Sequence, residues 1–124
     1  MKVANPFVVV DNCTEEIEYY RTLLGGEVKI FRKQDDKVLN AELNLGSSTI
    51  YFADSTAAKP SSKGDYVKIT LTLETEEEFR QVYEDLKAEG TIDSEVFEAP
   101  FNGLLAGITD RNGIGWVLSY FASI

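Results

Sequence analysis

The chain has 124 residues, of which 44% are hydrophobic and 11% aromatic, and this is the size and composition of one domain that buries its own core. Its 21 acidic and 12 basic residues give a formal net charge of −9, which repels phosphate backbones and argues against a nucleic-acid partner. No apolar run is long enough to cross a bilayer or to resemble a signal peptide, so the sequence predicts a cytoplasmic protein without a membrane partner.

The first half of the chain predicts a strand, a helix and three further strands. After an apolar strand at residues 6–10, Asn12 or Thr14 can cap a helix that places Ile17, Tyr20 and Leu24 on one face. A Gly-Gly pair ends this helix. Strands are expected at about 27–32, 38–45 and 49–53, with turns at 34–36 and 46–47. This order is a βαβββ module.

The second half repeats this order after a linker at 55–64 that is rich in small and turn-forming residues. A strand at 66–73 precedes Thr75-Glu-Glu-Glu78, which matches a capping box, and Phe79, Val82 and Leu86 follow at helical spacing. Further strands are expected at about 91–97, 104–109 and 114–120, with an Asn-Gly turn before the last. The sequence therefore predicts two modules, at about 5–54 and 65–121. Two facing modules create a cleft, where small ligands bind.

Strand alternation predicts which side chains enter that cleft. The side chains expected under the helices are Val67, Ile69, Leu71 and Leu73 in one strand and Leu39, Ala41, Leu43 and Leu45 in another. The polar residues between them are expected on the other side: Lys68, Thr70, Thr72, Asn40, Glu42 and Asn44. On pattern alone, such polar rows are equally a pocket lining and an ordinary solvated sheet face.

Two segments resemble a known family. Residues 13–27 (CTEEIEYYRTLLGGE) resemble the first-helix signature of the PhnB-like branch of the vicinal oxygen chelate superfamily, which holds glyoxalase I, bleomycin resistance proteins and extradiol dioxygenases. Residues 110–118 (DRNGIGWVL) resemble the family's final hairpin. The resemblance implies an α+β, glyoxalase-like fold for 1–124, in which two paired βαβββ modules form a curled mixed sheet around a central cleft and the helices lie on the outer face. It also implies a homodimer.

Metal-dependent members of this family carry a set of His and Glu ligands. Matching by position places those ligands near Asn5, near Tyr51, at Lys68 and at Val117, and the chain has no histidine at all. Asn40 also stands where relatives often have His. A lysine ammonium has no lone pair to offer a metal, and a valine cannot ligate one. We therefore expect no metal and no other cofactor.

Few reactive groups remain. Cys13 is the only cysteine; at a helix start it is either an activated thiol or a small apolar residue behind the cap, and no histidine is present to activate it. Glu42 and Lys68 form either an acid/base pair or a simple ion pair.

We therefore expect a small-molecule binding protein of this superfamily that holds a partly aromatic ligand in the inter-module cleft, with residues 98–103 as a mobile lip. The acid excess either keeps the protein soluble or attracts a cationic ligand. The predicted ligand-binding residues are Phe7, Asn40, Glu42, Tyr51, Lys68, Thr70, Phe101 and Trp116. The alternatives are a metal-dependent lyase, isomerase or dioxygenase of the same superfamily, and a scaffold protein whose cleft is filled by its own side chains.

Overall fold

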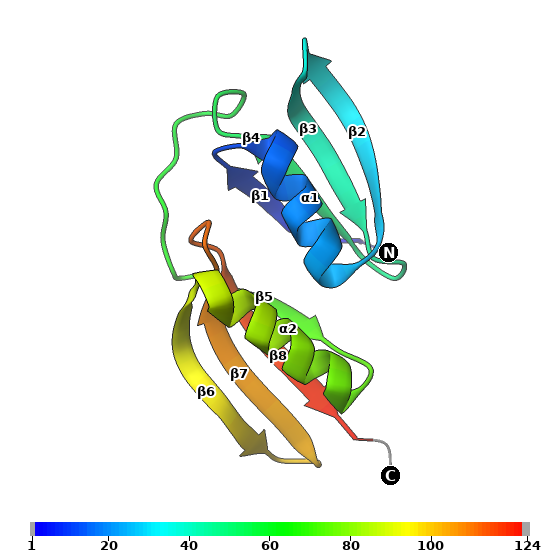
Figure 1. Ribbon diagram of the computed structural model, residues 1–124, viewed down its shortest axis with the longest axis vertical. Coiled ribbons are helices and arrows are strands. Elements are labelled where there is room, and N and C mark those ends of the chain that lie inside the picture. Colours follow the sequence, from blue (N-terminus) through cyan, green and yellow to red (C-terminus); the bar gives the residue numbers. More distant parts are fainter. Residues whose placement is uncertain (1, 123–124) are drawn as a thin grey trace. The chain divides into compact units, whose positions relative to one another are not determined.

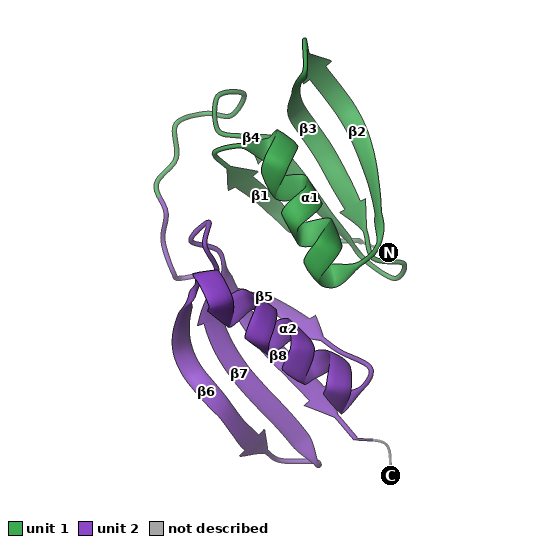
Figure 2. Ribbon diagram, in the orientation of Figure 1, with its two compact units in different colours: residues 1–62 green, residues 63–124 purple. Residues whose placement is uncertain are grey.

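The computed structural model describes residues 2–122 of the chain. The chain divides into two compact units, residues 1–62 and 63–124 (Figure 2). Each unit contains a strand, a helix and three further strands in that order (Figure 1), so each is a βαβββ module as predicted. The first holds β1 (Phe7–Val10), α1 (Cys13–Leu24), β2 (Glu27–Gln34), β3 (Lys37–Asn44) and β4 (Thr49–Asp54); the second holds β5 (Ile69–Thr72), α2 (Glu76–Glu89), β6 (Thr91–Ala99), β7 (Gly103–Thr109) and β8 (Gly115–Phe121).

The first unit is a four-stranded sheet with α1 on one face. Its strand order is β1-β4-β3-β2, with β1 parallel to β4 and the other pairs antiparallel. Ile17 and Tyr20 of α1 are buried, and the Tyr20 ring lies 5.2 Å from that of Phe52 between centroids. On the strands, buried residues alternate with residues that point to the open face. The buried ones include Val8, Val10, Ala41, Leu43, Ile50 and Phe52.

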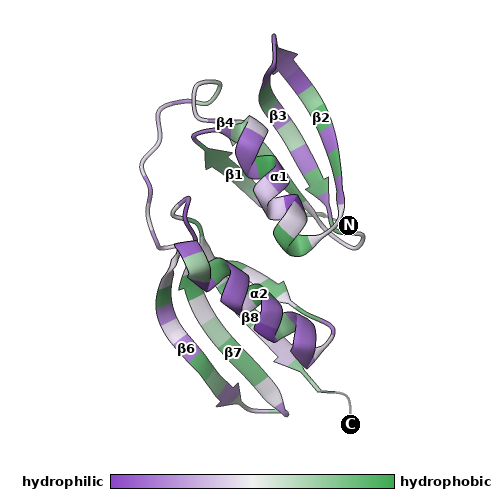
Figure 3. Ribbon diagram, viewed as in Figure 1, coloured by the Kyte–Doolittle hydropathy of each residue, from purple (hydrophilic) through white to green (hydrophobic). Residues whose placement is uncertain are grey.

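The second unit repeats this plan with the order β5-β8-β7-β6, in which β5 is parallel to β8. The predicted stripe of α2 is buried, and it covers Ala106, Ile108, Trp116 and Leu118 of the sheet. In Figure 3, β7 is hydrophobic along most of its length, whereas β2 and β6 alternate between hydrophobic and hydrophilic residues. None of the described helices is long and apolar enough to span a membrane.

Side chains fix the start of α1 in two ways. Asn12 is the N-cap, and its Oδ1 accepts a hydrogen bond of 3.3 Å from the amide of Glu15. Thr14, the other predicted cap, has a different partner: its Oγ1 accepts from the amide of Val38 at 2.9 Å. Thr14 therefore ties the helix to β3.

Thr75 caps α2 as predicted, because its Oγ1 accepts from the amide of Glu78 at 3.0 Å. The reciprocal half of the capping box is displaced by one residue. A capping box has the N-cap amide, here that of Thr75, donate to the Glu side chain. In this structure the Glu78 carboxylate accepts instead from the amide of Glu74, at 3.3 Å.

Irregular pairing changes the predicted alternation in β3. The register between β2 and β3 shifts between Ile30 and Lys33, and Leu39 has no partner in the ladder. Such a bulge reverses the order of inward and outward positions beyond it. Val38 is therefore buried while Leu39 is half-buried, and the prediction that Leu39 enters the core is wrong. Leu45 lies beyond the end of β3 and is also half-buried.

The first strand of the second unit is shorter than predicted, since pairing with β8 begins at Ile69. Tyr66 and Val67 precede it and are exposed, Val67 at 84%, so the prediction that Val67 packs under a helix is wrong. Ile69 and Leu71 are half-buried and Leu73 is buried. The other predicted strands differ at their ends by one or two residues, the usual error of boundary assignment.

Candidate functional site

The sheet face of the second unit that points away from α2 carries the main candidate site. Trp116 and Leu118 point toward the helix, so Val117 between them points away from it. Val117 is paired with Thr70 on one side and Gly107 on the other. Thr70 therefore lies on the face away from the helix, as the sequence predicts.

A hollow of about 270 Å³ lies on this open face. Its lining is mostly apolar: Phe97 from β6, Leu105, Ala106 and Gly107 from β7, and Val117 from β8. Three polar residues complete it: Lys68 before β5, and Asp93 and Ser94 of β6. An apolar floor with a few polar groups is the usual composition of a small-molecule site.

Lys68 lies directly against Gly115. A Cβ atom at Gly115 would be 3.0 Å from Lys68 Cγ and 3.3 Å from Lys68 Nζ, so the lysine occupies the space that a side chain there would take. No group described in residues 63–122 forms a hydrogen bond or ion pair with the Lys68 ammonium. Asp93, in contrast, accepts a hydrogen bond of 2.7 Å from Thr109 Oγ1. Lys68 thus has donor capacity to offer a ligand.

The first sheet brings together another group of predicted residues. Phe7 is paired with Tyr51, Tyr51 with Glu42, and Glu42 with Lys29, so these four residues form one row across the face opposite α1. The Phe31 ring lies 6.5 Å from that of Tyr51, between centroids. Their role as ligand contacts stays a prediction.

Asn40, also on β3, accepts a hydrogen bond of 2.9 Å from Arg32 Nε, so its amide oxygen already has a partner.

Trp116 lies on the helix side of the second sheet and is only 2% exposed. Its Nε1 donates a hydrogen bond of 2.8 Å to the buried Asp110 carboxylate, which also accepts from the amides of Asn112 and Ile114. The motif at 110–118 therefore holds the β7–β8 hairpin together. This position leaves Trp116 little surface for a ligand.

Phe101 is 86% exposed and lies in the turn between β6 and β7, with a φ of 64°. It is not part of the hollow beside Lys68. A second hollow of about 390 Å³ includes its neighbours Asn102 and Gly103 and the start of α2. There, Arg80 Nε is paired with Glu76 at 3.0 Å, so these two charges compensate each other, and Glu98 adds a negative charge to the lining.

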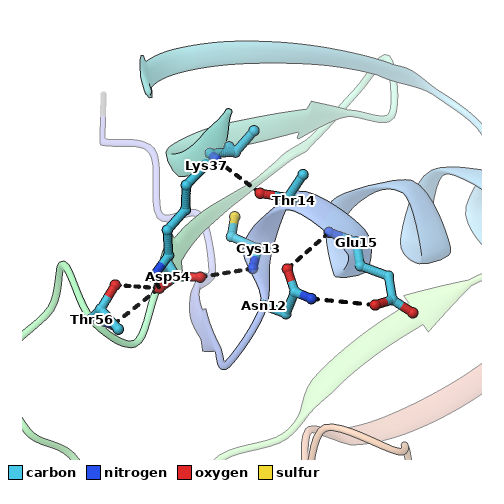
Figure 4. Close-up of polar contacts among 8 residues, drawn as sticks. Asn12, Cys13, Thr14, Glu15, Lys37, Asp54 and Thr56 are labelled. Carbon is cyan, nitrogen blue, oxygen red and sulfur yellow. Dashed lines mark hydrogen bonds and ion pairs between the residues drawn. The ribbon is translucent and has the colours of Figure 1, made fainter. Parts of the chain in front are cut away.

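Cys13 and Asp54 form a buried polar cluster at the start of α1 (Figure 4). Burial raises the pKa of the Cys13 thiol to about 11, and the negative charge of Asp54 acts in the same direction. The Asp54 carboxylate accepts from the Cys13 amide at 2.9 Å and from the amide and hydroxyl of Thr56. The thiol is therefore protonated at neutral pH, which fits the structural role and excludes an activated nucleophile.

The donor set does not fit the metal of the family's metal-dependent members. At two positions that the resemblance matches to metal ligands, Lys68 offers a cation and Val117 a hydrocarbon side chain. Both residues line the same hollow. Within residues 2–122 no three His, Cys, Asp or Glu side chains gather in a way that could hold a metal ion. These residues give no support to a step that uses a bound metal.

Residues 2–118 match the model of the Glyoxalase/Bleomycin resistance protein/Dioxygenase superfamily. The chain belongs to this superfamily. It is 26% identical over 131 residues to the protein YjdN of Escherichia coli (strain K12), with 87% of each chain covered. Its fold is similar to the crystal structure of PA1353 from Pseudomonas aeruginosa, with a TM-score of 0.84, 21% identity and 99% and 100% of the two chains covered.

A PhnB protein from Bacillus cereus, described as a putative 3-demethylubiquinone-9 3-methyltransferase, is also similar, with a TM-score of 0.74, 20% identity and 96% and 99% coverage. These comparisons confirm the predicted superfamily, its PhnB-like relatives and the α+β fold. Identities this low show a shared fold and leave the activity to be argued from the site.

Several residues that line the hollow were not predicted from the sequence. Leu105 and Gly107 lie in a strand that is apolar on both faces, so alternation cannot separate its two sides. Asp93 and Phe97 flank register shifts in β6, which break the two-residue period. Gly107 offered one signal, since a glycine inside a strand often marks a close approach or an open space.

Proposed function

We propose that this protein binds a small organic molecule in the hollow beside Lys68, without a catalytic metal. The observation that carries the proposal is the combination of an apolar floor with an ammonium that has no partner within its own unit. A volume of about 270 Å³ suits a compact ligand or one ring system of a larger one. A cleft shared by the two modules stays a prediction; every residue that supports the proposed site belongs to the second unit.

The chemistry of the site supports binding more than catalysis. The only thiol is buried and protonated, the chain has no histidine, and two positions that the resemblance matches to metal ligands carry Lys68 and Val117. Metal-independent bleomycin resistance proteins, which this chain resembles, act by binding a small molecule and catalyse no reaction. A metal-dependent lyase, isomerase or dioxygenase is the rival function, and it requires a stoichiometric divalent ion.

Two measurements test the proposed function. Metal analysis of protein purified without chelators is expected to find no stoichiometric nickel, zinc, iron or manganese, and such a metal would contradict metal-free binding. A thermal-shift screen of metabolites and antibiotics is expected to yield a ligand. Such a ligand is detectable because, at 100 times its dissociation constant, it stabilises a fold by about 2.7 kcal/mol.

A pair of glycine variants then locates the ligand. A Cβ at Gly107 would meet no atom closer than 3.5 Å, so Gly107→Leu extends its side chain over the hollow and is expected to abolish binding. Gly64→Leu is the matched control, because a Cβ there has no atom within 4 Å and Gly64 lies outside the hollow. Unchanged affinity in Gly107→Leu would place the ligand elsewhere.

We also propose a homodimer. The exposed edge strand β2 carries Ile30 and Phe31, which are 46% and 49% exposed, and such edges are usually covered or blunted. Light scattering at tens of micromolar, a concentration at which weak dimers still form, is expected to give twice 13.8 kDa. A mass of 13.8 kDa would contradict it.

A further inference from the structure

We infer that the ligand of the hollow beside Lys68 is an organic anion, a compact apolar ring system that carries a carboxylate or similar acid group. In this arrangement Lys68 pairs with the acid, and Gly115 positions Lys68. The inference rests on the proposed binding function and adds the charge of the ligand to it.

The charges that line the hollow favour an anion. Lys68 and Asp93 are its two ionisable residues, and they differ in what they already bind. Asp93 accepts a short hydrogen bond from Thr109, whereas the Lys68 ammonium has no partner described in residues 63–122. An ammonium beside apolar surface gains most from a charge-assisted hydrogen bond to an anion. A cationic ligand would lie near the like charge of Lys68 and an anion near that of Asp93, whose hydrogen bond from a neutral hydroxyl leaves its charge in place. The unused donors of Lys68 therefore favour the anion.

The net charge of −9 points the other way, toward cationic ligands. That charge is spread over the whole surface, and salt screens exposed charges beyond about 8 Å at physiological ionic strength. The Lys68 ammonium is at the hollow itself. A ligand in the hollow therefore responds to Lys68 more than to the distant acidic residues.

The position of Lys68 depends on Gly115. Its stem lies over Gly115, where a Cβ would be 3.0 Å from Cγ and 3.3 Å from Nζ. The backbone of Gly115 is outside the left-handed region, so an alanine there is compatible with the main chain. The three nearest atoms to such a Cβ all belong to the Lys68 side chain, so Gly115→Ala is expected to shift the lysine and to leave the sheet intact.

Three probes on one ring system test the charge preference: 2-naphthoate, the neutral 2-naphthylmethanol and the cationic 2-naphthylmethylammonium. Binding is followed by NMR chemical shifts of the backbone amides of Leu105, Gly107 and Val117. The anion is expected to bind about tenfold more tightly than the neutral probe, in line with the strength of a charge-assisted hydrogen bond, and the cation most weakly.

Variants assign this preference to Lys68. Lys68→Met is expected to abolish the tenfold advantage of the anion and to leave the neutral probe within about twofold, and Gly115→Ala is expected to reduce the advantage severalfold. Lys59→Met is the control, because it removes the same charge from the linker at 55–64, outside the hollow.

The outcomes separate the inference from the function on which it rests. Equal or tighter binding of the neutral or cationic probe at these amides overturns the anion preference and leaves the proposed function standing. An anion advantage that persists in Lys68→Met overturns the role of Lys68. If none of the probes shifts these amides at several millimolar, the proposed site fails, and the inference fails with it.

Discussion

Replacing Asp54 with asparagine is expected to destabilise the first unit strongly. Asp54 is fully buried at the end of β4. One of its oxygens accepts from the Cys13 amide, and the other accepts from the amide and hydroxyl of Thr56. Asparagine keeps the shape of the side chain but replaces one oxygen with an NH₂ group. That NH₂ group would then face a backbone N–H donor, of Cys13 or of Thr56, in place of the carboxylate oxygen that accepts from it.

The magnitude follows from these contacts. The substitution removes at least one charge-assisted hydrogen bond, worth about 1.5–3 kcal/mol, and leaves a buried donor facing a donor, so the expected loss is about 2–4 kcal/mol of unfolding free energy. The ion pair with Lys37, at 3.4 Å, contributes little to this sum because the lysine is 46% exposed. Lys37→Met is therefore the control, with an expected loss below about 1 kcal/mol.

The same carboxylate predicts a pH dependence. Burial raises the pKa of Asp54, but the hydrogen bonds from Cys13 and Thr56 and the pairing with Lys37 outweigh it, so the net pKa lies below the ordinary value of 3.8. The unfolded chain then binds this proton more readily than the folded chain. The stabilisation is fully present above pH 3.8 and is lost as the pH falls through the lower folded pKa.

Urea denaturation of wild type, Asp54→Asn and Lys37→Met at neutral pH measures the loss. The difference between wild type and Asp54→Asn is then followed from about pH 6 to about pH 2.5, a range that includes the ordinary pKa. The difference is expected to shrink only below the ordinary pKa. A loss under about 1 kcal/mol, or a difference that is constant with pH, would refute the role assigned to this carboxylate.

Three other predictions follow from the described contacts. Cys13 is expected to resist a thiol reagent in the folded protein at pH 8, because a pKa of about 11 leaves only about 0.1% thiolate; prompt reaction before unfolding would contradict this. Gly26→Ala is expected to cost at least about 2 kcal/mol more than Gly25→Ala in urea denaturation, since both have positive φ but only a Cβ at Gly26 meets a backbone oxygen, at 2.5 Å; equal losses would exclude the steric reason. Trp116→Phe is expected to cost about 1–3 kcal/mol because the buried Asp110 loses the indole donor, and an unchanged midpoint would contradict it.

Local rules predicted much of the fold from the sequence. The caps at Asn12 and Thr75, the stripe of α2 and the turn at 112–113 depend on contacts within a few residues, and the structure confirms them. The repeat of the two modules follows from the order of these elements. Short-range hydrogen bonds and helical periodicity are visible in sequence because both partners lie in one window.

Features that depend on pairing between strands were predicted less well. The bulge that buries Val38 and half-exposes Leu39 arises from the register with β2, which no single strand encodes. Likewise, β5 begins only at Ile69 because β8 defines where pairing starts. Asp93 and Phe97 line the hollow and lie in the irregular part of β6. Strand alternation did not predict them because the register shifts there.

The residues that identify the superfamily differ from those that carry the proposed site. Asp110 and Trp116 mark the final hairpin, yet their polar atoms bond to each other and serve the fold. Such residues predict architecture well and ligand chemistry poorly, because a satisfied buried group has nothing left to offer a ligand. By the resemblance described above, Lys68 and Val117 stand at positions where metal-dependent members carry ligands. The Lys68 ammonium has no lone pair for a metal ion, and Gly115 leaves the space that this side chain occupies.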